Sequence, residues 1–248
     1  MKIICTGYWK TGTKSMSKAL SDLGYNVYDY AEQLFFLKSL WYKFFDGTIT
    51  DEDIYNAFKD VDVIIDGPAI AFWEEIYRVF PNAKVIHTIR DEDKWWKSFK
   101  GMQDKFYGTF GIFRFLFFLS PTGYYIMHLG SKLFNYAYGI ENMLLVLKWS
   151  SNERLYKLKY RKHNAYVLHT VPENKRLVHE PSHGWKPLCE YLDMEVPDKP
   201  YPHQNKDASI FTTELNTNPL FCKMFQEFKI FLCIVVVVLA AAALWFFK

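Results

Sequence analysis

The chain has 248 residues, half of them hydrophobic, which excludes a disordered protein, and only 12 Gly and 10 Pro, which excludes a collagen-like one. With 30 Lys plus Arg against 27 Asp plus Glu, the net charge of +3 gives no basis for a nucleic-acid partner, and four Cys are too few for a disulfide scaffold. The unusual value is the aromatic content of 19%.

Short apolar runs alternate with helical patterns along most of the chain. The predicted strands are residues 2–6, 25–28, 61–66, 84–89 and 176–179. The predicted helices are residues 14–23, 31–45, 51–58, 69–80, 91–106, 132–147, 151–170 and 186–192, whereas 107–131 are expected to be irregular. Strands that alternate with helices form βαβ units. We therefore predict a three-layer α/β P-loop fold with a central parallel sheet of about five strands flanked by helices.

The C-terminus carries an unbroken apolar run over residues 230–247, IFLCIVVVVLAAAALWFF. Its 18 residues are at the lower edge of the length that spans a bilayer as a helix. A buried core helix is the alternative, although such a helix rarely lacks every polar position. The N-terminus does not have the pattern of a signal peptide. We therefore expect a single-pass C-terminal membrane anchor over 230–247, a linker over 213–229 at the end of a Pro-rich connection that begins at 195, and an N-terminal domain over 1–212 that faces the cytosol.

The loop after the first predicted strand has the composition of an anion-binding site. Gly7 and Gly12 allow a tight backbone turn, and the start of the next helix adds the positive end of a helix dipole. Further donors are Lys10, Thr11, Gly12, Thr13, Lys14 and Ser15. In a nucleotide-hydrolysing P-loop, Lys and Ser or Thr follow the second Gly directly, but here they come one place late. An ATP- or GTP-binding protein is therefore the less favoured alternative.

Two further polar residues follow the fourth predicted strand. Arg90 stands where the strand ends, and Ser98 lies on the following helix. An Arg side chain can donate two parallel hydrogen bonds to a phosphate, and a hydroxyl adds one more donor. Without other evidence, an Arg-Asp pair at a strand end is more typical of a salt bridge or a cap.

The two sites together resemble those of the sulfotransferases that use 3′-phosphoadenosine 5′-phosphosulfate, and the chain resembles the P-loop sulfotransferase-like family over about residues 1–212. The matching segments are 7–16 (GYWKTGTKSM), 66–73 (DGPAIAFW), 81–86 (PNAKVI), 94–98 (KWWKS), 184–189 (GWKPLC) and 196–202 (VPDKPYP). The resemblance implies that residues 10–15 bind the 5′-phosphosulfate of this donor and that Arg90 and Ser98 bind its 3′-phosphate, without a metal. Lys10 stands where many relatives carry Arg, and it would stabilise the leaving phosphate.

Asp66 ends the third predicted strand, directly before Gly67-Pro68. Parallel geometry places it beside the first loop, where a base is needed to take the proton of an acceptor hydroxyl. The same position suits a turn cap, or a carboxylate that holds Mg²⁺ in P-loop nucleotide hydrolases. Asp66 and Lys10 are the candidate catalytic residues.

The aromatic residues concentrate in two segments, with nine in 25–45 and twelve in 106–138. Helix packing would explain them. The alternatives are a pocket for an apolar or aromatic hydroxyl acceptor, or a face that lies on the membrane. The sequence thus favours a membrane-anchored sulfotransferase-like enzyme, and the rivals are a nucleotide-binding P-loop protein and a catalytically silent scaffold of the same fold.

Overall fold

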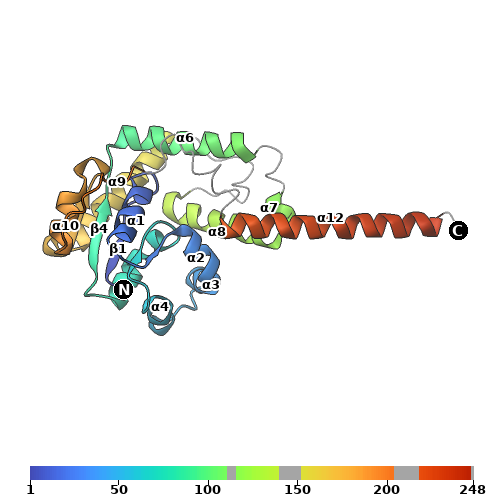
Figure 1. Ribbon diagram of the computed structural model, residues 1–248, viewed down its shortest axis with the longest axis horizontal. Coiled ribbons are helices and arrows are strands. Elements are labelled where there is room, and N and C mark those ends of the chain that lie inside the picture. The colour runs from blue at the N-terminus through green and yellow to red at the C-terminus, as the bar shows by residue number, and fades with distance from the viewer. Residues whose placement is uncertain (111–115, 140–151, 204–217, 247–248) are drawn as a thin grey trace.

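The computed structural model describes residues 1–110, 116–139, 152–203 and 218–246 (Figure 1). Within these residues, five parallel strands form a sheet in the order β2-β3-β1-β4-β5. The strands are β1 (Ile3–Cys5), β2 (Val27–Tyr28), β3 (Val63–Ile64), β4 (Lys84–Thr88) and β5 (Arg176–His179). The predicted α/β fold with a parallel sheet of about five strands is confirmed, and every predicted strand position is occupied.

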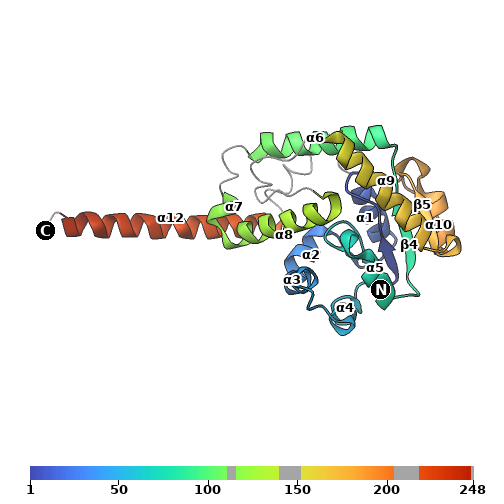
Figure 2. The same cartoon turned by 180° about the vertical axis from the view of Figure 1, so that it is seen from behind.

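Helices cover both faces of the sheet because the strand side chains alternate between them. On one face, Ile3, Cys5 and Ile86 pack against α1 (Thr13–Asp22) and α10 (Trp185–Leu192). On the other face, a second cluster joins the sheet to α4 (Asp51–Phe58), α5 (Trp73–Val79) and α9 (Glu153–Thr170). The rear view shows α5 and α9 on the side of the sheet away from α10 (Figure 2). The three-layer arrangement follows from strands that are apolar on both sides.

The aromatic segment predicted as one helix over 31–45 forms two helices, α2 (Tyr30–Phe36) and α3 (Lys38–Asp46). Leu37 leaves helical geometry between them, with φ −112° and ψ 25°. The break lets the Trp41 indole donate a 3.0 Å hydrogen bond to the carbonyl of Gln33, with the indole ring fully buried. Tertiary packing therefore overrides a continuous helical pattern at this point.

The prediction of irregular structure over 107–131 is wrong for the described residues of this segment, and residues 111–115 lie outside them. Helix α6 (Glu92–Phe110) continues into this segment, and α7 (Leu116–Leu119) and α8 (Pro121–Tyr138) follow. Helix α8 begins with Pro121 in its first turn, where the missing N–H costs nothing, and the Ser120 hydroxyl caps it by accepting from the Gly123 N–H at 3.0 Å. The predicted helical residues 140–147 and 151 lie outside the described residues.

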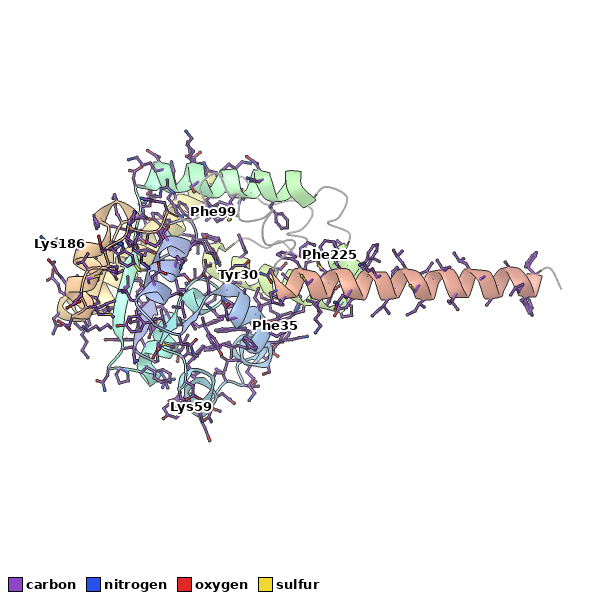
Figure 3. All side chains as sticks on the ribbon, in the orientation of Figure 1. Tyr30, Phe35, Lys59, Phe99, Lys186 and Phe225 are labelled. Carbon is purple, nitrogen blue, oxygen red and sulfur yellow. The ribbon has the colours of Figure 1, made fainter. Side chains whose placement is uncertain are left out.

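The C-terminal helix α12 (Pro219–Phe246) is 28 residues long and begins inside the segment predicted as a linker. Its apolar window is not buried in the domain, which contradicts the alternative of a core helix. By length and composition α12 is a candidate membrane span. It projects from the domain with its side chains directed outward along the free part (Figure 3). Its first turns pack against α7 and α8 through Phe117, Met127 and Met224.

Candidate functional site

The loop between β1 and α1 has the backbone geometry of an anion-binding turn. Gly12 precedes the first residue of α1 with φ 102°, in the region that favours glycine, and a Cβ there would lie 2.3 Å from Cγ of Pro181. No described side chain caps this helix end, and the first turn of α1 carries no acidic residue. A helix start of this kind offers N–H groups and the positive end of a dipole to a bound anion.

On the side that faces the sheet, the loop between β1 and α1 is fixed by hydrogen bonds and close packing. Thr11 is buried, donates a 2.6 Å hydrogen bond to the Tyr8 carbonyl, and lies 2.7 Å from the Thr88 hydroxyl. Gly7 is equally close-packed, because a Cβ there would lie 1.9 Å from Oγ1 of Thr88. The Thr11 side chain is thus directed into the interior of the domain. In this respect Thr11 differs from the other predicted donor-site residues, which line a cavity.

Those other residues come together around one cavity at the carboxyl edge of the sheet. The cavity is lined by Lys10, Gly12, Thr13, Lys14, Ser15, Arg90 and Ser98. Arg90 follows β4, and its backbone is fixed by the Tyr160 hydroxyl, which accepts from the Arg90 N–H at 3.0 Å and donates to the Arg90 carbonyl at 2.8 Å. Its guanidinium Nη1 lies 3.4 Å from the Lys10 carbonyl. Ser98 comes from α6, so three separate segments form the cavity.

The cations of this cavity are held in two different ways. Lys14 lies 2.5 Å from Asp29 and 3.9 Å from Asp66, with its Nζ 4.0 Å from the ring centre of Tyr30. In contrast, neither Lys10 nor Arg90 forms an ion pair within the described part of the chain. Burial lowers the pKa of Lys10, Asp66 partly opposes this, and the nearby charges of Arg90 and Lys14 lower it further. A bound anion would relieve this electrostatic cost.

Comparison with known proteins gives the family of this fold. Residues 2–210 match the family described as sulfotransferase domain. The chain belongs to this family. It is also 29% identical over 217 residues to Ava biosynthesis cluster protein M from Aspergillus versicolor, in a match that covers 82% of this chain and 80% of that protein. The predicted resemblance to the sulfotransferase-like family is therefore confirmed.

Asp66 occupies a constrained position in this sulfotransferase domain. It is a non-glycine residue with a φ of 71°, as is Lys10, and such values are uncommon outside sites with a specific constraint. The residue is 4% exposed, and its carboxylate accepts from the Gly67 N–H at 2.7 Å and from the Thr13 hydroxyl at 3.0 Å. The bond from the Gly67 N–H is the kind that a turn cap forms. The bond from the Thr13 hydroxyl connects the segment after β3 to the start of α1.

The environment of Asp66 shifts the pKa of its carboxyl upward. Burial raises the pKa of its carboxyl, Lys14 opposes that shift, and the charge of Asp29 adds to it. Asp66 does not itself line the cavity of Lys10 and Arg90, although Thr13 does. Among the described residues there is no group of three or more His, Cys, Asp or Glu side chains that could hold a metal ion. The role of Asp66 as a base stays a prediction.

Sequence reasoning missed Tyr160, which positions Arg90. It lies on α9, where Tyr156, Tyr160 and Val167 are buried. These residues and His163 repeat at a spacing of three to four, which is the signal of a packed helix face. His163 also contributes to the loop, because its ring stacks on Tyr8 at 3.9 Å and its Nε2 lies 2.6 Å from the Thr6 carbonyl.

Most of the aromatic side chains described in α8 serve packing. Near the loop, Phe134 stacks on Trp9 with ring centres 5.2 Å apart, and the Tyr8 hydroxyl donates to the Ala137 carbonyl at 3.3 Å. A second cavity of about 300 Å³ lies beside Tyr8. Its lining comes from the 3-10 helix η1 (Ala69–Ala71), from α5, α8 and α9 and from the adjoining loops, and it includes Ile70, Phe72, Tyr136, Lys159 and His163.

Proposed function

We propose that this protein transfers a sulfuryl group from 3′-phosphoadenosine 5′-phosphosulfate to a hydroxyl acceptor. The observation that carries the proposal is the donor cavity, where Lys10 and Arg90 stand without an acidic partner among the described residues and Ser98 adds a hydroxyl. Two cations that line one cavity suit a ligand that carries more than one anionic group. The family to which the chain belongs supports the same chemistry.

Each end of the donor has a matching set of residues. The start of α1 with Lys10, Thr13 and Ser15 would hold the 5′-phosphosulfate. Arg90 and Ser98 would hold the 3′-phosphate. Thr11 would contribute through its position in the loop backbone, since its hydroxyl is engaged with Tyr8 and Thr88.

In the proposed reaction, the acceptor oxygen forms a bond to sulfur while the bond between sulfur and the bridging phosphate oxygen breaks. The leaving group is 3′-phosphoadenosine 5′-phosphate, and Lys10 would stabilise the charge that develops on its 5′-phosphate. Asp66 would accept the proton of the acceptor hydroxyl. Its raised pKa suits proton uptake, and its carboxylate keeps lone pairs beyond the two hydrogen bonds from Gly67 and Thr13.

The second cavity is our candidate for the acceptor. Tyr8 connects it to the donor loop, and Ile70 follows Asp66 closely in the chain, with its N–H donating to the Asp66 carbonyl at 3.2 Å. Phe72 and Tyr136 give it an aromatic lining, which suits an apolar or aromatic alcohol. We further propose that α12 anchors the enzyme in a membrane with the N-terminal domain on the cytosolic side.

Calorimetry tests the donor site directly. The full-length protein in detergent is titrated with 3′-phosphoadenosine 5′-phosphate and, separately, with ATP and Mg²⁺. We expect the bisphosphate to bind. Arg90→Ala should lower its affinity by roughly 10- to 100-fold, which corresponds to the about 1.5–3 kcal/mol typical of a charged hydrogen-bonding group. Arg78→Ala is the matched control. Arg78 lies on the surface of α5 and forms an ion pair with Asp51 at the start of α4.

The rival functions give different results in the same titrations. Tight binding of ATP with Mg²⁺-dependent hydrolysis would favour a nucleotide-binding protein. Failure to bind the bisphosphate at all would favour a catalytically silent scaffold of the same fold.

A further inference from the structure

The junction between α12 and the domain is packed and not a flexible tether. Met224 of α12 is fully buried against Phe117 of α7 and Met127 of α8. At the beginning of α12, the Asn218 amide donates to the Tyr30 hydroxyl at 3.0 Å. Figures 1 and 2 both show α7 and α8 beside the first part of α12. The direction of α12 is therefore set by the domain.

Glu227 joins α12 to the corner between α7 and α8. Its carboxylate accepts hydrogen bonds from the Ser120 hydroxyl, from the Thr122 N–H at 2.9 Å and from the Thr122 hydroxyl at 2.7 Å. The acidic side chain thus lies at the N-terminus of α8, where the helix dipole favours a negative charge. These bonds place Ser120 level with Glu227 on α12.

The contact between Glu227 and Ser120 also fixes the position of α7 along the axis of α12, relative to the apolar span that begins at Ile230. Ile230 follows Glu227 by three positions, which is about 4.5 Å along a helix axis. The headgroup region on each side of a bilayer is about 5–7 Å thick. From Ile230 to its end at Phe246, α12 has 17 apolar residues, or about 26 Å of helix. This is less than the roughly 30 Å hydrocarbon core, and a short span draws its flanking residues toward the membrane.

The residues just before Ser120 are apolar and exposed. Phe118 and Leu119, at the end of α7, are 38% and 39% exposed, whereas Phe117 faces α12 and is buried. They stand at the height where α12 would enter the headgroup region. We propose that α7 lies in the lipid headgroup region as a second membrane contact, so that α7 and α12 together fix the orientation of the domain on the bilayer.

This orientation would extend to the donor site through α8. One end of α8 is tied to the junction by Glu227, and the other packs on the donor loop through Phe134 and Ala137. The proposal rests on the membrane anchoring put forward above. It does not depend on which donor or acceptor the enzyme uses.

Photo-crosslinking from single positions tests the proposal. A diazirine-bearing amino acid replaces Leu119, Leu158 or Leu239 in the full-length protein, which is then reconstituted into phosphatidylcholine vesicles and irradiated. Leu158, on α9, is the matched control because it is the same residue type with the same 39% exposure. Leu239 reports the span itself. We expect several-fold more lipid adduct from position 119 than from position 158, and the strongest adduct from position 239.

Each other outcome overturns the proposal in a distinguishable way. Lipid adducts at position 239 with equal, weak labelling at 119 and 158 would leave the anchor standing and remove α7 from the interface. Crosslinked protein dimers from position 119 would show that a second copy covers α7. Absence of lipid adduct at all three positions would reject the anchor as well, while calorimetry with the bisphosphate would still report on the donor site.

Discussion

The donor cavity and the α12 junction both bring charged side chains to a helix N-terminus, but they satisfy those charges differently. At the junction, the acidic Glu227 meets the start of α8 and accepts three hydrogen bonds from Ser120 and Thr122. At the cavity, Lys10 and Arg90 lie near the start of α1 without an acidic partner in the described residues. The charge of the first arrangement is satisfied within the domain, whereas the two cations of the second form no ion pair among the described residues.

This difference separates a structural joint from a binding site. Partly buried charges cost free energy unless they are paired, so an unpaired cluster persists where a ligand completes it. Lys14 shows that pairing is available close by, since it is held by Asp29 at 2.5 Å. The following predictions test the comparison, beginning with the largest expected effect.

Asp66→Asn should separate binding from chemistry. We expect sulfuryl transfer to fall by about 10²- to 10⁴-fold, because the amide is no longer a base, while affinity for 3′-phosphoadenosine 5′-phosphate changes little. Transfer is measured with radiolabelled donor and a panel of phenols and aliphatic alcohols. Unchanged turnover in the folded variant would leave Asp66 as a turn cap only.

Glu227→Ala should remove the hydrogen bonds between α12 and the start of α8 and thereby lower the stability of the protein. We expect a destabilisation of about 1–3 kcal/mol, because donors of Ser120 and Thr122 lose their acceptor, with donor affinity unchanged while the protein stays folded. Thermal unfolding in detergent measures this, with the exposed Glu195→Ala as the control. If Glu227→Ala instead weakened the bisphosphate as strongly as Arg90→Ala, the two regions would not be separable.

Ser98, which lines the cavity from α6, and Thr11, which is bonded to Tyr8 and Thr88 behind the loop, should affect different properties when substituted. Ser98→Ala should weaken bisphosphate binding by roughly 5-fold, about 1 kcal/mol, with the melting temperature unchanged. Thr11→Val should mainly lower the melting temperature, because the Thr88 hydroxyl and the Tyr8 carbonyl lose their partner. A reversed pattern would mean that the Thr11 hydroxyl contacts the ligand.

The smallest expected effect is a pH dependence of donor binding from Lys10. Its pKa is lowered in the free protein, so its charge is lost earlier as the pH rises, and the neutral amine no longer attracts phosphate. Affinity for the bisphosphate should therefore be highest below this lowered pKa and fall a few-fold as the pH rises through it. Lys10→Arg should abolish the decrease, because Arg stays protonated throughout. A decrease that persists in Lys10→Arg would assign the titration to another group.

The parts of the fold that the sequence predicted well are those with local signals. Runs such as VDVIID identify a buried strand, and Gly12 at the start of a helix identifies the anion loop, since few other residues adopt its φ of 102°. Helix starts at Pro121 and Pro219 were missed, although Ser-Pro and Asn-Pro are ordinary signals of a helix N-terminus.

The sequence by itself determined the family, the parallel sheet and the identity of most cavity residues, because glycines, strand ends and apolar runs act through neighbouring positions. Only the tertiary structure decided which donor-loop side chains face the cavity, since Thr11 and Thr13 differ by what packs behind them. It also decided that Tyr160 holds Arg90, and that Glu227 ties α12 to α8, across separations of 70 and 105 residues. Contacts at such distances leave no periodic pattern, and the packing of the whole domain fixes them.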